Sequence, residues 1–505
     1  MNISVFNGDV TERQTGALVV NLFEGVTAPG GATGAVDRAM GGLISSLVSD
    51  GEIRGKKGEL TLIHTPRPVY RDFGPSRVLV AGLGTQSKFD LDAVRSVSAG
   101  VARRLEQVGI SQAATVVHGA GIGGLDAGAC AEAIAEGTLL GTYRFDRYKS
   151  SGDETHRRLE HMELVEVDSS KIAEMETGVE RGKVMAEAAS LARDMVNEPA
   201  NMFSPTRMAE IASEVAHAAG LDCKVLERED AEKLGMGAYL GVAAGSDQPP
   251  KFIHMTYQGD PANPANDVWL VGKGITFDTG GISLKPAAGM GAMKGDMGGG
   301  ASVIGAMKAI AALKPVLNVH AVVAATENMP SGRAQRPGDV VRAMNGKYIE
   351  VDNTDAEGRL TLADAIGYAR SNGASRLVDI ATLTGAAVIA LGYGNTAVFG
   401  NDDVLVDQMI AAGKSRGEPM WRLPLDPVSK DQNESKIADV KNTGGRPAGS
   451  ITAAHFIAEF VGDTPWVHLD IAATSMTDST RGWAVPGATG VPARSLVQLV
   501  LDLAR

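Results

Sequence analysis

The chain contains 505 residues, of which 44% are hydrophobic and 21% are charged, and its formal net charge is −12. This length is enough for two or three domains with sizeable cores, and the composition is that of an ordinary globular protein enriched in glycine. The excess of acidic residues argues against general affinity for nucleic acids. No apolar segment is long enough and free enough of charge to predict a membrane-spanning helix.

Two features of the sequence bear on the cellular compartment. The two cysteines, Cys130 and Cys223, lie far apart and in no metal-binding spacing, so a disulfide framework is not expected. The first residues include neither a basic region nor a long apolar core, which is unlike a signal peptide. We therefore expect a cytoplasmic protein.

Residues 1–170 are predicted to form an α/β domain. Short apolar runs predict strands at Ala17–Leu22, Val78–Ala81 and Ala114–His118, and a helical pattern covers Leu91–Val108. Strands that alternate with helices in this way are typical of a sheet covered by helices.

The segment Gly119–Gly124 follows one of these strands and matches the letters of a GxGxxG dinucleotide fingerprint. A dinucleotide site would also need a second strand ending in an acidic residue about 20 residues further on. Residues 139–148 instead show a helical pattern followed by charges. A glycine turn is therefore the favoured interpretation, and a bound dinucleotide is the less favoured alternative.

Residues 171–197 are predicted to form a long helix that joins two domains. Apolar residues recur at helical spacing, and the segment Asn197–Asn201 contains a proline that ends the pattern. Gly178 and Gly182 lie inside the pattern, and each is expected to cost about 1 kcal/mol of helix stability relative to alanine.

Strand and helix patterns alternate through residues 198–505. Strands are predicted at Phe252–Tyr257, Val268–Val271, Val319–Ala324, Tyr348–Val351, Leu377–Ala381 and Trp466–Ile471. Helices are predicted at Ala301–Leu313, Leu360–Arg370 and Ile451–Phe460. This order predicts a mainly parallel sheet flanked by helices, whose ligands bind at the carboxyl ends of the strands. Lys273 and Asp355 are both predicted to follow such strand ends.

Residues 353–360 read Asn-Thr-Asp-Ala-Glu-Gly-Arg-Leu and place three charges between a strand and a helix. Asp355 and Glu357 are two residues apart, and Arg359 follows two residues later. Acidic and basic groups crowded at such a junction can bind a metal ion or an anion. A charged turn without a ligand is the alternative, because charged turns are common.

A second segment, residues 268–296, favours the metal site. Its charges, which include Lys273, Asp278, Lys285 and Asp296, lie among glycines and apolar residues. A buried charge without a partner is costly, so such charges usually pair with one another or bind metal. Together with Asp355 and Glu357, the two aspartates could hold two divalent cations through oxygen.

These two segments resemble the leucyl aminopeptidases, the cytosolic two-metal enzymes that remove N-terminal residues from peptides. The stretches NTDAEGRL and VGKGITFDTGGISLKP carry the resemblance, which covers residues 170–505 well, whereas the first 160 residues are similar to the family only in size and general character. The resemblance implies an N-terminal α/β domain over 1–170, a linking helix over 171–197 and a catalytic two-metal domain over 198–505.

The resemblance also implies roles for individual residues. One metal ion would be held by Asp278, Glu357 and the side chain and carbonyl of Asp355. The other would be held by Lys273, Asp278, Asp296 and Glu357. The two non-ligand catalytic positions would be Lys285 and Arg359. The pocket for the substrate side chain would be lined by Met293, Thr382, Gly385, Ala473 and Met476.

The mechanism that the resemblance implies is hydrolysis of the N-terminal peptide bond by a hydroxide that bridges the two metal ions. Leucine and other apolar residues would be preferred at the cleaved end. Lys285 would stabilise the tetrahedral oxyanion, and Arg359 would hold a bicarbonate ion that acts as general base. Manganese or zinc would be bound, magnesium or cobalt would also suit the ligands, and the assembly would be a homohexamer.

Three other functions are weaker interpretations of the sequence. A phosphate-handling hydrolase could use the glycine-rich run at 280–300, but no GxxxxGK[ST] motif is present. DNA binding occurs in some bacterial relatives, but no basic cluster supports it here. A histidine-based zinc protease would need HExxH, which is missing; His320 and His468 lie in apolar strands and are predicted to be core residues.

Overall fold

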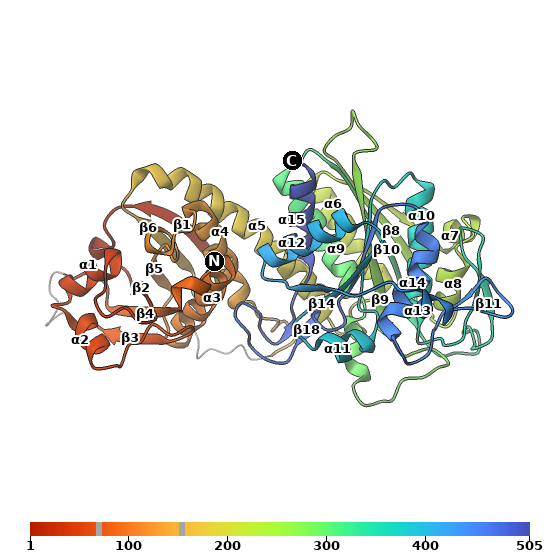
Figure 1. Ribbon diagram of the computed structural model, residues 1–505, viewed down its shortest axis with the longest axis horizontal. Coiled ribbons are helices and arrows are strands. Elements are labelled where there is room, and N and C mark those ends of the chain that lie inside the picture. Colours follow the sequence, from red (N-terminus) through yellow and green to blue (C-terminus); the bar gives the residue numbers. More distant parts are fainter. Residues whose placement is uncertain (67–72, 151–156) are drawn as a thin grey trace. The chain divides into compact units, whose positions relative to one another are not determined.

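The computed structural model describes residues 1–66, 73–150 and 157–505, and its chain divides into two compact units (Figure 1). One unit comprises Met1–Ala186 and Ser479–Val485, and the other comprises Glu187–Asp478 and Pro486–Arg505. The boundary falls inside the long helix α5, Ile172–Asn197. None of the described helices combines the length and the apolar character that crossing a membrane requires.

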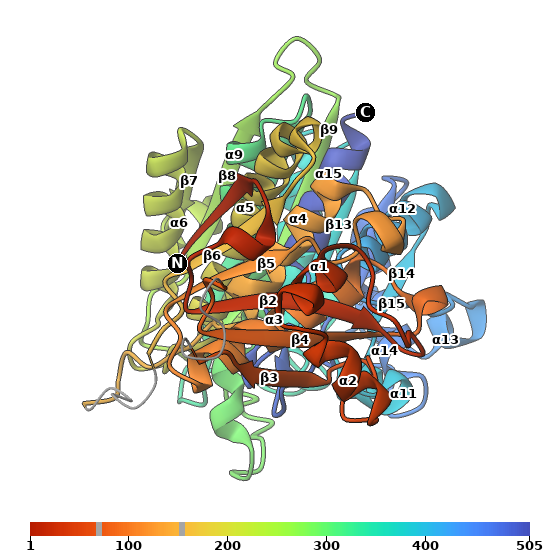
Figure 2. The ribbon, with the colours of Figure 1, turned by 90° about the vertical axis from the view of Figure 1, so that its left-hand side faces the viewer.

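The N-terminal unit is built around a six-stranded sheet with the order β1-β6-β5-β2-β4-β3 (Figure 2). Its strands are β1 Asn2–Asn7, β2 Ala17–Phe23, β3 Leu60–His64, β4 Arg77–Gly84, β5 Gln112–Val116 and β6 His161–Glu166. All neighbouring strands are parallel except β3, which runs antiparallel to β4 at one edge. The predicted α/β character of this region is therefore confirmed.

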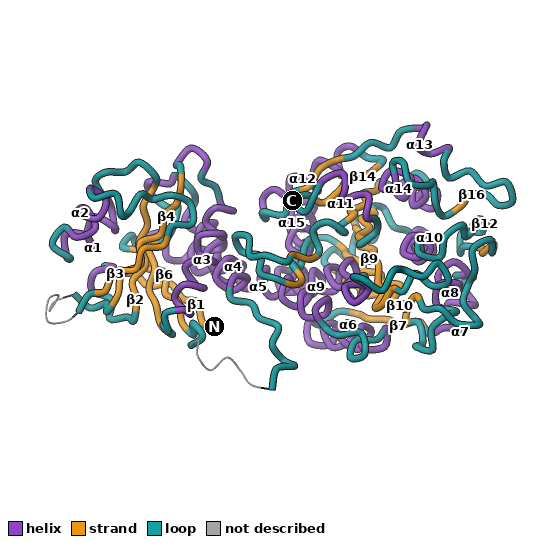
Figure 3. The backbone as a smooth tube through the Cα atoms, turned by 90° about the horizontal axis from the view of Figure 1, so that it is seen from below, coloured by secondary structure: helices purple, strands orange, loops and turns teal. Residues whose placement is uncertain are grey.

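Helices cover both faces of this sheet, as the tube in Figure 3 shows. They are α1 Gly31–Ala39, α2 Leu43–Ser49, α3 Leu91–Gln107 and α4 Ala127–Gly141, with short 3-10 turns at Val10–Glu12, Gln86–Lys88, Gly121–Gly123 and Ser169–Lys171. One core cluster joins the sheet to α3, α4 and the first turns of α5, and a second joins it to α1 and α2. The inner strands β2 and β4 are buried on both sides, which is why their sequences are almost continuously apolar, whereas the edge strands β1 and β3 are partly exposed.

The segment Gly119–Gly124 forms a turn between β5 and α4. Gly119, Gly121 and Gly124 have φ values of +93°, +71° and +70°, which an L side chain rarely adopts. Asp126 then caps α4 by accepting a hydrogen bond from Ala129 N at 2.8 Å. Within the described residues no strand lies between α4 and β6, so the second strand of a dinucleotide site is missing at the expected place.

The C-terminal unit contains an eight-stranded sheet with the order β15-β14-β17-β13-β9-β10-β8-β7. The strands are β7 Asp222–Leu226, β8 Lys251–Gln258, β9 Asp267–Asp278, β10 Asn318–Asn328, β13 Leu377–Ala381, β14 Thr396–Gly400, β15 Met420–Arg422 and β17 Trp466–Asp470. The four central strands β17, β13, β9 and β10 are parallel. Strands β7 and β8 pair antiparallel with their neighbours, and β14 pairs antiparallel with β17 but parallel with β15. The sheet is thus mainly parallel at its centre, as expected.

Helices cover both faces of this second sheet as well (Figure 3). They are α6 Pro205–Ala219, α7 Arg228–Lys233, α8 Gly237–Ala243, α9 Gly298–Leu313, α10 Glu357–Ser371, α11 Gly385–Leu391, α12 Asp403–Ser415, α13 Pro427–Asp431, α14 Gly449–Val461 and α15 Ala493–Leu503. One large core cluster joins α8, α10 and α14 to β9, β10 and β13. Smaller elements are the 3-10 helix η5 Met290–Gly295, a sheet of β11 Val340–Arg342, β12 Tyr348–Glu350 and β16 Val440–Lys441, and a ribbon of β18 Met476–Thr477 and β19 Gly487–Ala488.

Two details of the predicted strands were wrong. Strand β9 does not end before Gly272 but continues through Lys273 to Asp278, because β10 pairs with it from Asp267 to Ile275 and, after a shift in register, again at Asp278. The strand before Asp355 is β12, which belongs to the small three-stranded sheet and not to the central one. Local apolar patterns identify a strand but contain no information on how far its partner extends or which sheet it joins.

Candidate metal centre and catalytic pocket

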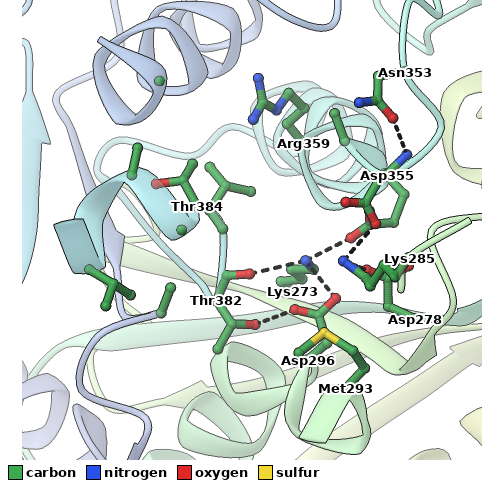
Figure 4. Close-up of a pocket in the computed structure, with 18 of the residues that line it drawn as sticks. Lys273, Asp278, Lys285, Met293, Asp296, Asn353, Asp355, Arg359, Thr382 and Thr384 are labelled. Atoms are coloured by element: carbon green, nitrogen blue, oxygen red, sulfur yellow. Dashed lines mark hydrogen bonds and ion pairs between the residues drawn. The ribbon is translucent and has the colours of Figure 1, made fainter. Parts of the chain in front are cut away.

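The charged residues singled out in the sequence converge on one pocket of the C-terminal unit (Figure 4). Lys273 and Asp278 lie on β9, and Asp296 lies between η5 and α9. Asp355 lies in the turn before α10, and Glu357 is the first residue of that helix. The site therefore combines a central strand with two helix beginnings, where backbone N–H groups favour negative charge.

Lys273 is 3% exposed, and its ammonium group lies between two carboxylates. Its Nζ is 2.7 Å from Asp296 Oδ2 and 2.7 Å from Glu357 Oε1, and it donates to the carbonyl of Thr382 at 3.1 Å. Burial lowers the pKa of Lys273, but the nearby carboxylates outweigh burial, so the pKa is raised overall.

Lys285 makes an equivalent pair of contacts on the other side of the cluster. Its Nζ is 2.8 Å from Asp278 Oδ2 and 2.6 Å from Asp355 Oδ1. The pKa of Lys285 is also raised, because these carboxylates outweigh the opposing effect of burial. In contrast to Lys273, its side chain is 22% exposed, so it can reach a molecule in the cavity.

Four carboxylates lie close together around these two ammonium groups, and their mutual repulsion is reduced by nearby positive charge. Burial raises the pKa values of Asp278, Asp296 and Asp355, and repulsion from neighbouring carboxylates adds to the effect. One oxygen each of Asp278, Asp355 and Glu357 lies within 4.8 Å of the others. Among the described residues Glu357 Oε2 has no hydrogen-bond partner. A set of oxygen donors with an unused buried lone pair fits hard divalent cations.

Neighbouring polar groups hold two of these carboxylates in place. Asp278 Oδ1 accepts hydrogen bonds from Asn328 Nδ2 and Gly280 N, both at 2.8 Å. Asp296 Oδ1 accepts from the Thr382 hydroxyl at 2.7 Å. Such bonds orient metal ligands and leave the remaining oxygen of each carboxylate directed at the cluster. Asn328 was missed in the sequence, although a polar residue at the end of the strand beside β9 was a usable indication.

Arg359 lies on α10 beside the cluster. Its Nη1 donates to the carbonyl of Asn442 at 2.7 Å, while its Nε has no hydrogen-bond partner among the residues that the structure describes. Burial lowers the pKa of Arg359 to about 10, which leaves the guanidinium charged at neutral pH. A buried cation with an unused donor is suited to an anion.

The cluster opens into a cavity of about 780 Å³. Every predicted ligand and both predicted catalytic residues line it, as do Met293, Thr382, Gly385 and Met476. Ala473 is 1% exposed, whereas its neighbours Ala472 and Ser475 line the cavity. The cavity wall also includes residues that the sequence did not single out, namely Asn353, Thr384, Val388, Ile389, Tyr393, Thr443, Gly444, Gly445 and Arg446. The glycine pair followed by arginine was the sequence feature that could have indicated part of this wall.

The two histidines predicted to be core residues lie apart from the cluster. His468 is fully buried on β17, and its Nδ1 is 2.6 Å from Asp379 Oδ1 on β13. His320 stacks on Trp269, with ring centroids 4.2 Å apart, and its Nδ1 is 3.1 Å from His254 Nε2. Both rings are therefore held by packing and hydrogen bonds inside the sheet, as expected.

Comparison with known proteins agrees with this geometry. The family model described as "Cytosol aminopeptidase family, catalytic domain" matches residues 190–497, and that described as "Cytosol aminopeptidase family, N-terminal domain" matches residues 19–152. The second match corrects the weak resemblance expected for the first 160 residues. The N-terminal sequence lacks short charged motifs of the kind that carry the resemblance in residues 268–296 and 353–360.

Relatives and solved structures extend the likeness over the whole chain. The chain is 44% identical to a probable cytosol aminopeptidase of Alkaliphilus metalliredigens, with 100% of both chains covered, and 46% identical to one of Solibacter usitatus, with 99% of both covered. A mutant of tomato leucine aminopeptidase has a TM-score of 0.88 at 33% identity, covering 99% of this chain and 96% of that one. The bottromycin maturation enzyme BotP in complex with Mn has a TM-score of 0.84 at 35% identity, covering 97% and 100%. This chain therefore belongs to the cytosol aminopeptidase family.

Proposed function

We propose that this chain, a metal-dependent aminopeptidase of the leucyl aminopeptidase type, removes the N-terminal residue from peptides with two divalent ions bound in its acidic cluster. The observation that carries the proposal is the convergence of four carboxylates, two lysines and one arginine on a single cavity. Asp278, Asp355 and Glu357 would hold one ion, and Lys273, Asp278, Asp296 and Glu357 would hold the other. When bound, the ions supply Lewis acidity that lowers the pKa of water and polarises a peptide carbonyl.

Lys273 is proposed to change its protonation state when the cluster is loaded. In the present structure its ammonium group neutralises Asp296 and Glu357. A nitrogen that ligates a metal must be neutral, and a dication nearby stabilises the neutral form of lysine. Lys273 would therefore release its proton to solvent and use the same nitrogen to bind the ion, with Asp296 and Glu357 already in contact with this nitrogen.

Lys285 and Arg359 are proposed to act on the reacting groups. Lys285 would donate from Nζ to the oxyanion that develops on the peptide carbonyl, since its ammonium is charged and reaches the cavity. Arg359 would hold a bicarbonate ion, which supplies a general base, with help from the N–H groups at the beginning of α10. The unused Nε of Arg359 supports this anion site.

The preferred N-terminal residue is proposed to be leucine or another apolar residue. Met293 and Met476 supply flexible apolar surface in the cavity, while Thr382 and Gly385 leave room beside them. Ala473 is proposed as part of the same pocket on the basis of the resemblance alone, because Ala472 and Ser475 are the residues that line the cavity.

Manganese or zinc is proposed as the bound metal, with magnesium or cobalt as alternatives that the same oxygen-rich ligand set accepts. The manganese complex of BotP favours manganese. A cytoplasmic location is proposed from the names of the relatives and from the two cysteines, Cys130 and Cys223, which are both free. A homohexamer is proposed from the family resemblance.

The proposal is tested by elemental analysis of the purified protein together with leucine-amide hydrolysis before and after chelation. We expect two equivalents of metal per chain, loss of hydrolysis on chelation, and recovery when manganese or zinc is returned. A peptide with a blocked N-terminus should be a poor substrate. Turnover of a phosphate ester that survives chelation, with no turnover of the amide, would instead favour a phosphate-handling hydrolase.

A pair of variants locates the metal within the chain. Asp355→Asn should lose metal and lower kcat by orders of magnitude, because it removes a charged ligand. Glu350→Gln is the matched control: this nearby acid accepts a hydrogen bond from Ser435 Oγ at 2.5 Å and should keep its metal. Metal retained by Asp355→Asn would contradict the ligand assignment.

A further inference from the structure

Asn442 lies directly beside the turn that carries Asp355, although it is far from it in the sequence. It is fully buried and follows β16, which pairs in parallel with β12 at Ile349–Val440 and Glu350–Lys441. Its N–H donates to the carbonyl of Glu350 at 3.0 Å and so extends this pairing by one residue. The position of its backbone is therefore set by the small sheet.

The side-chain amide of Asn442 bonds to the backbone of the turn at four points. Oδ1 accepts from the N–H groups of Asp352 at 2.8 Å and Asn353 at 3.2 Å. Nδ2 donates to the carbonyls of Asn353 at 2.7 Å and Ala356 at 3.3 Å. These bonds use both donors and both acceptor sites of an amide, so no other neutral side chain of this size can replace it. They enclose the turn on both sides of Asp355.

The main chain of Asn442 also binds Arg359, the positively charged side chain beside the acidic cluster. Its carbonyl accepts the hydrogen bond from Arg359 Nη1 at 2.7 Å. One buried residue thus contacts both the turn before α10, which contains Asp355, and the guanidinium of Arg359 on α10. A displacement of Asn442 would move acidic ligands and arginine together.

We propose that Asn442 is a positioning residue, which holds the turn 352–356 and Arg359 in the geometry that cation binding and hydrolysis need. The inference rests on the proposed two-metal function. Metal ligands must be held within about 0.5 Å of their productive positions. An irregular turn has no regular backbone hydrogen bonds of a helix or sheet to hold them there. Replacing such supporting partners typically weakens metal affinity by about 10- to 100-fold.

The test is the affinity of the full-length, metal-free protein for Mn²⁺ alone, measured by titration calorimetry. Asn442→Asp has the same shape and keeps both acceptors, but it turns a carboxylate oxygen towards the carbonyls of Asn353 and Ala356. We expect its Kd for Mn²⁺ to rise by about 10- to 100-fold. At saturating Mn²⁺ we expect kcat to fall while KM changes little, because Asn442 is not among the residues that line the cavity.

Asn318→Asp is the matched control. Asn318 is 5% exposed and binds a surface turn in the same way, since Oδ1 accepts from Asp260 N at 3.0 Å and Nδ2 donates to the carbonyls of Asp260 at 2.8 Å and Asn263 at 3.0 Å. This variant should lose a comparable amount of thermal stability and keep the wild-type Kd for Mn²⁺.

The outcomes separate the inference from the function on which it rests. Wild-type Kd and kcat in Asn442→Asp, with a lowered Tm, would overturn the positioning role and leave Asn442 as a structural residue only. Wild-type protein that binds no Mn²⁺ and hydrolyses no amide would overturn the proposed function itself. If Asn442→Asp does not fold, Asn442→Ala provides the same comparison, since it removes all four bonds to the turn without adding a charge.

Discussion

Two lysines with similar surroundings are assigned different roles at the site. Lys273 is almost completely buried and contacts Asp296 and Glu357, whereas Lys285 is partly exposed and contacts Asp278 and Asp355. Residue type, charge and position at the cavity do not distinguish them, but exposure does, because the side chain of Lys273 is 3% exposed and that of Lys285 is 22% exposed. The amine of Lys273 is enclosed by its carboxylate partners and acts on the cluster, while the more exposed amine of Lys285 can also reach substrate.

Lys285→Ala tests this difference at the scale of one residue. We expect kcat for leucine amide to fall by about 100- to 1,000-fold, the usual cost of removing one oxyanion donor. Metal content, measured by elemental analysis, should stay at the wild-type level because the four carboxylates and Lys273 remain.

Lys308→Ala is the control, since it removes an exposed lysine 2.9 Å from Glu187 and should leave kcat unchanged. Loss of metal from Lys285→Ala would mean that the roles assigned to Lys273 and Lys285 are exchanged.

At the scale of elements, helix α5 shows how tertiary packing changes the effect of a glycine on stability. Gly178 and Gly182 were expected to weaken this helix. A Cβ placed on Gly178 would lie 2.1 Å from the carbonyl oxygen of Gly128, and one placed on Gly182 would lie 2.4 Å from that of Glu132. Both acceptors belong to α4, so the two glycines allow α4 and α5 to approach more closely than any side chain would permit.

Gly178→Ala is therefore expected to destabilise the protein, even though alanine favours a helix. Overpacking typically costs about 1–3 kcal/mol, which exceeds the gain of about 1 kcal/mol in helix propensity. The measurement is the Tm of the purified variant, with circular dichroism to confirm that it folds.

Gly100→Ala is the matched variant inside α3, where a Cβ would meet only Leu60 Cδ1, at an ordinary 3.7 Å. It should keep or raise the Tm. Equal Tm values for the two variants would show that α4 and α5 are not packed as closely as described.

At the scale of the whole molecule, the proposed hexamer would cover apolar side chains that a single chain leaves in water. Val428 and Trp421 are 76% and 62% exposed. Burying such side chains between subunits would contribute favourable free energy, because water is released from apolar surface.

Light scattering on the purified protein tests this assembly. A mass six times that of the 52.4 kDa chain is expected, at protein concentrations both above and below those used for the activity assay. A mass of one chain with full leucine-amide hydrolysis would show that a single subunit is sufficient, and it would contradict the hexamer.

The sequence by itself determined the α/β class, the acidic cluster and the family. The proposed metal ligands occupy two short segments, around Asp278 and around Asp355. Charged residues among glycines and apolar residues are recognisable there without knowledge of the fold. Strand and helix patterns were equally local, so the order of elements could be predicted.

Only the tertiary structure decided how far β9 extends, that Ala472 and not Ala473 lines the cavity, and that Asn442 holds the acid-bearing turn. Each of these depends on the register between segments that are distant in the chain. The sequence around Asn442 does not distinguish it from any other asparagine in a loop. Its contacts arise from the pairing of β16 with β12, which leaves no periodicity or charge pattern in the sequence.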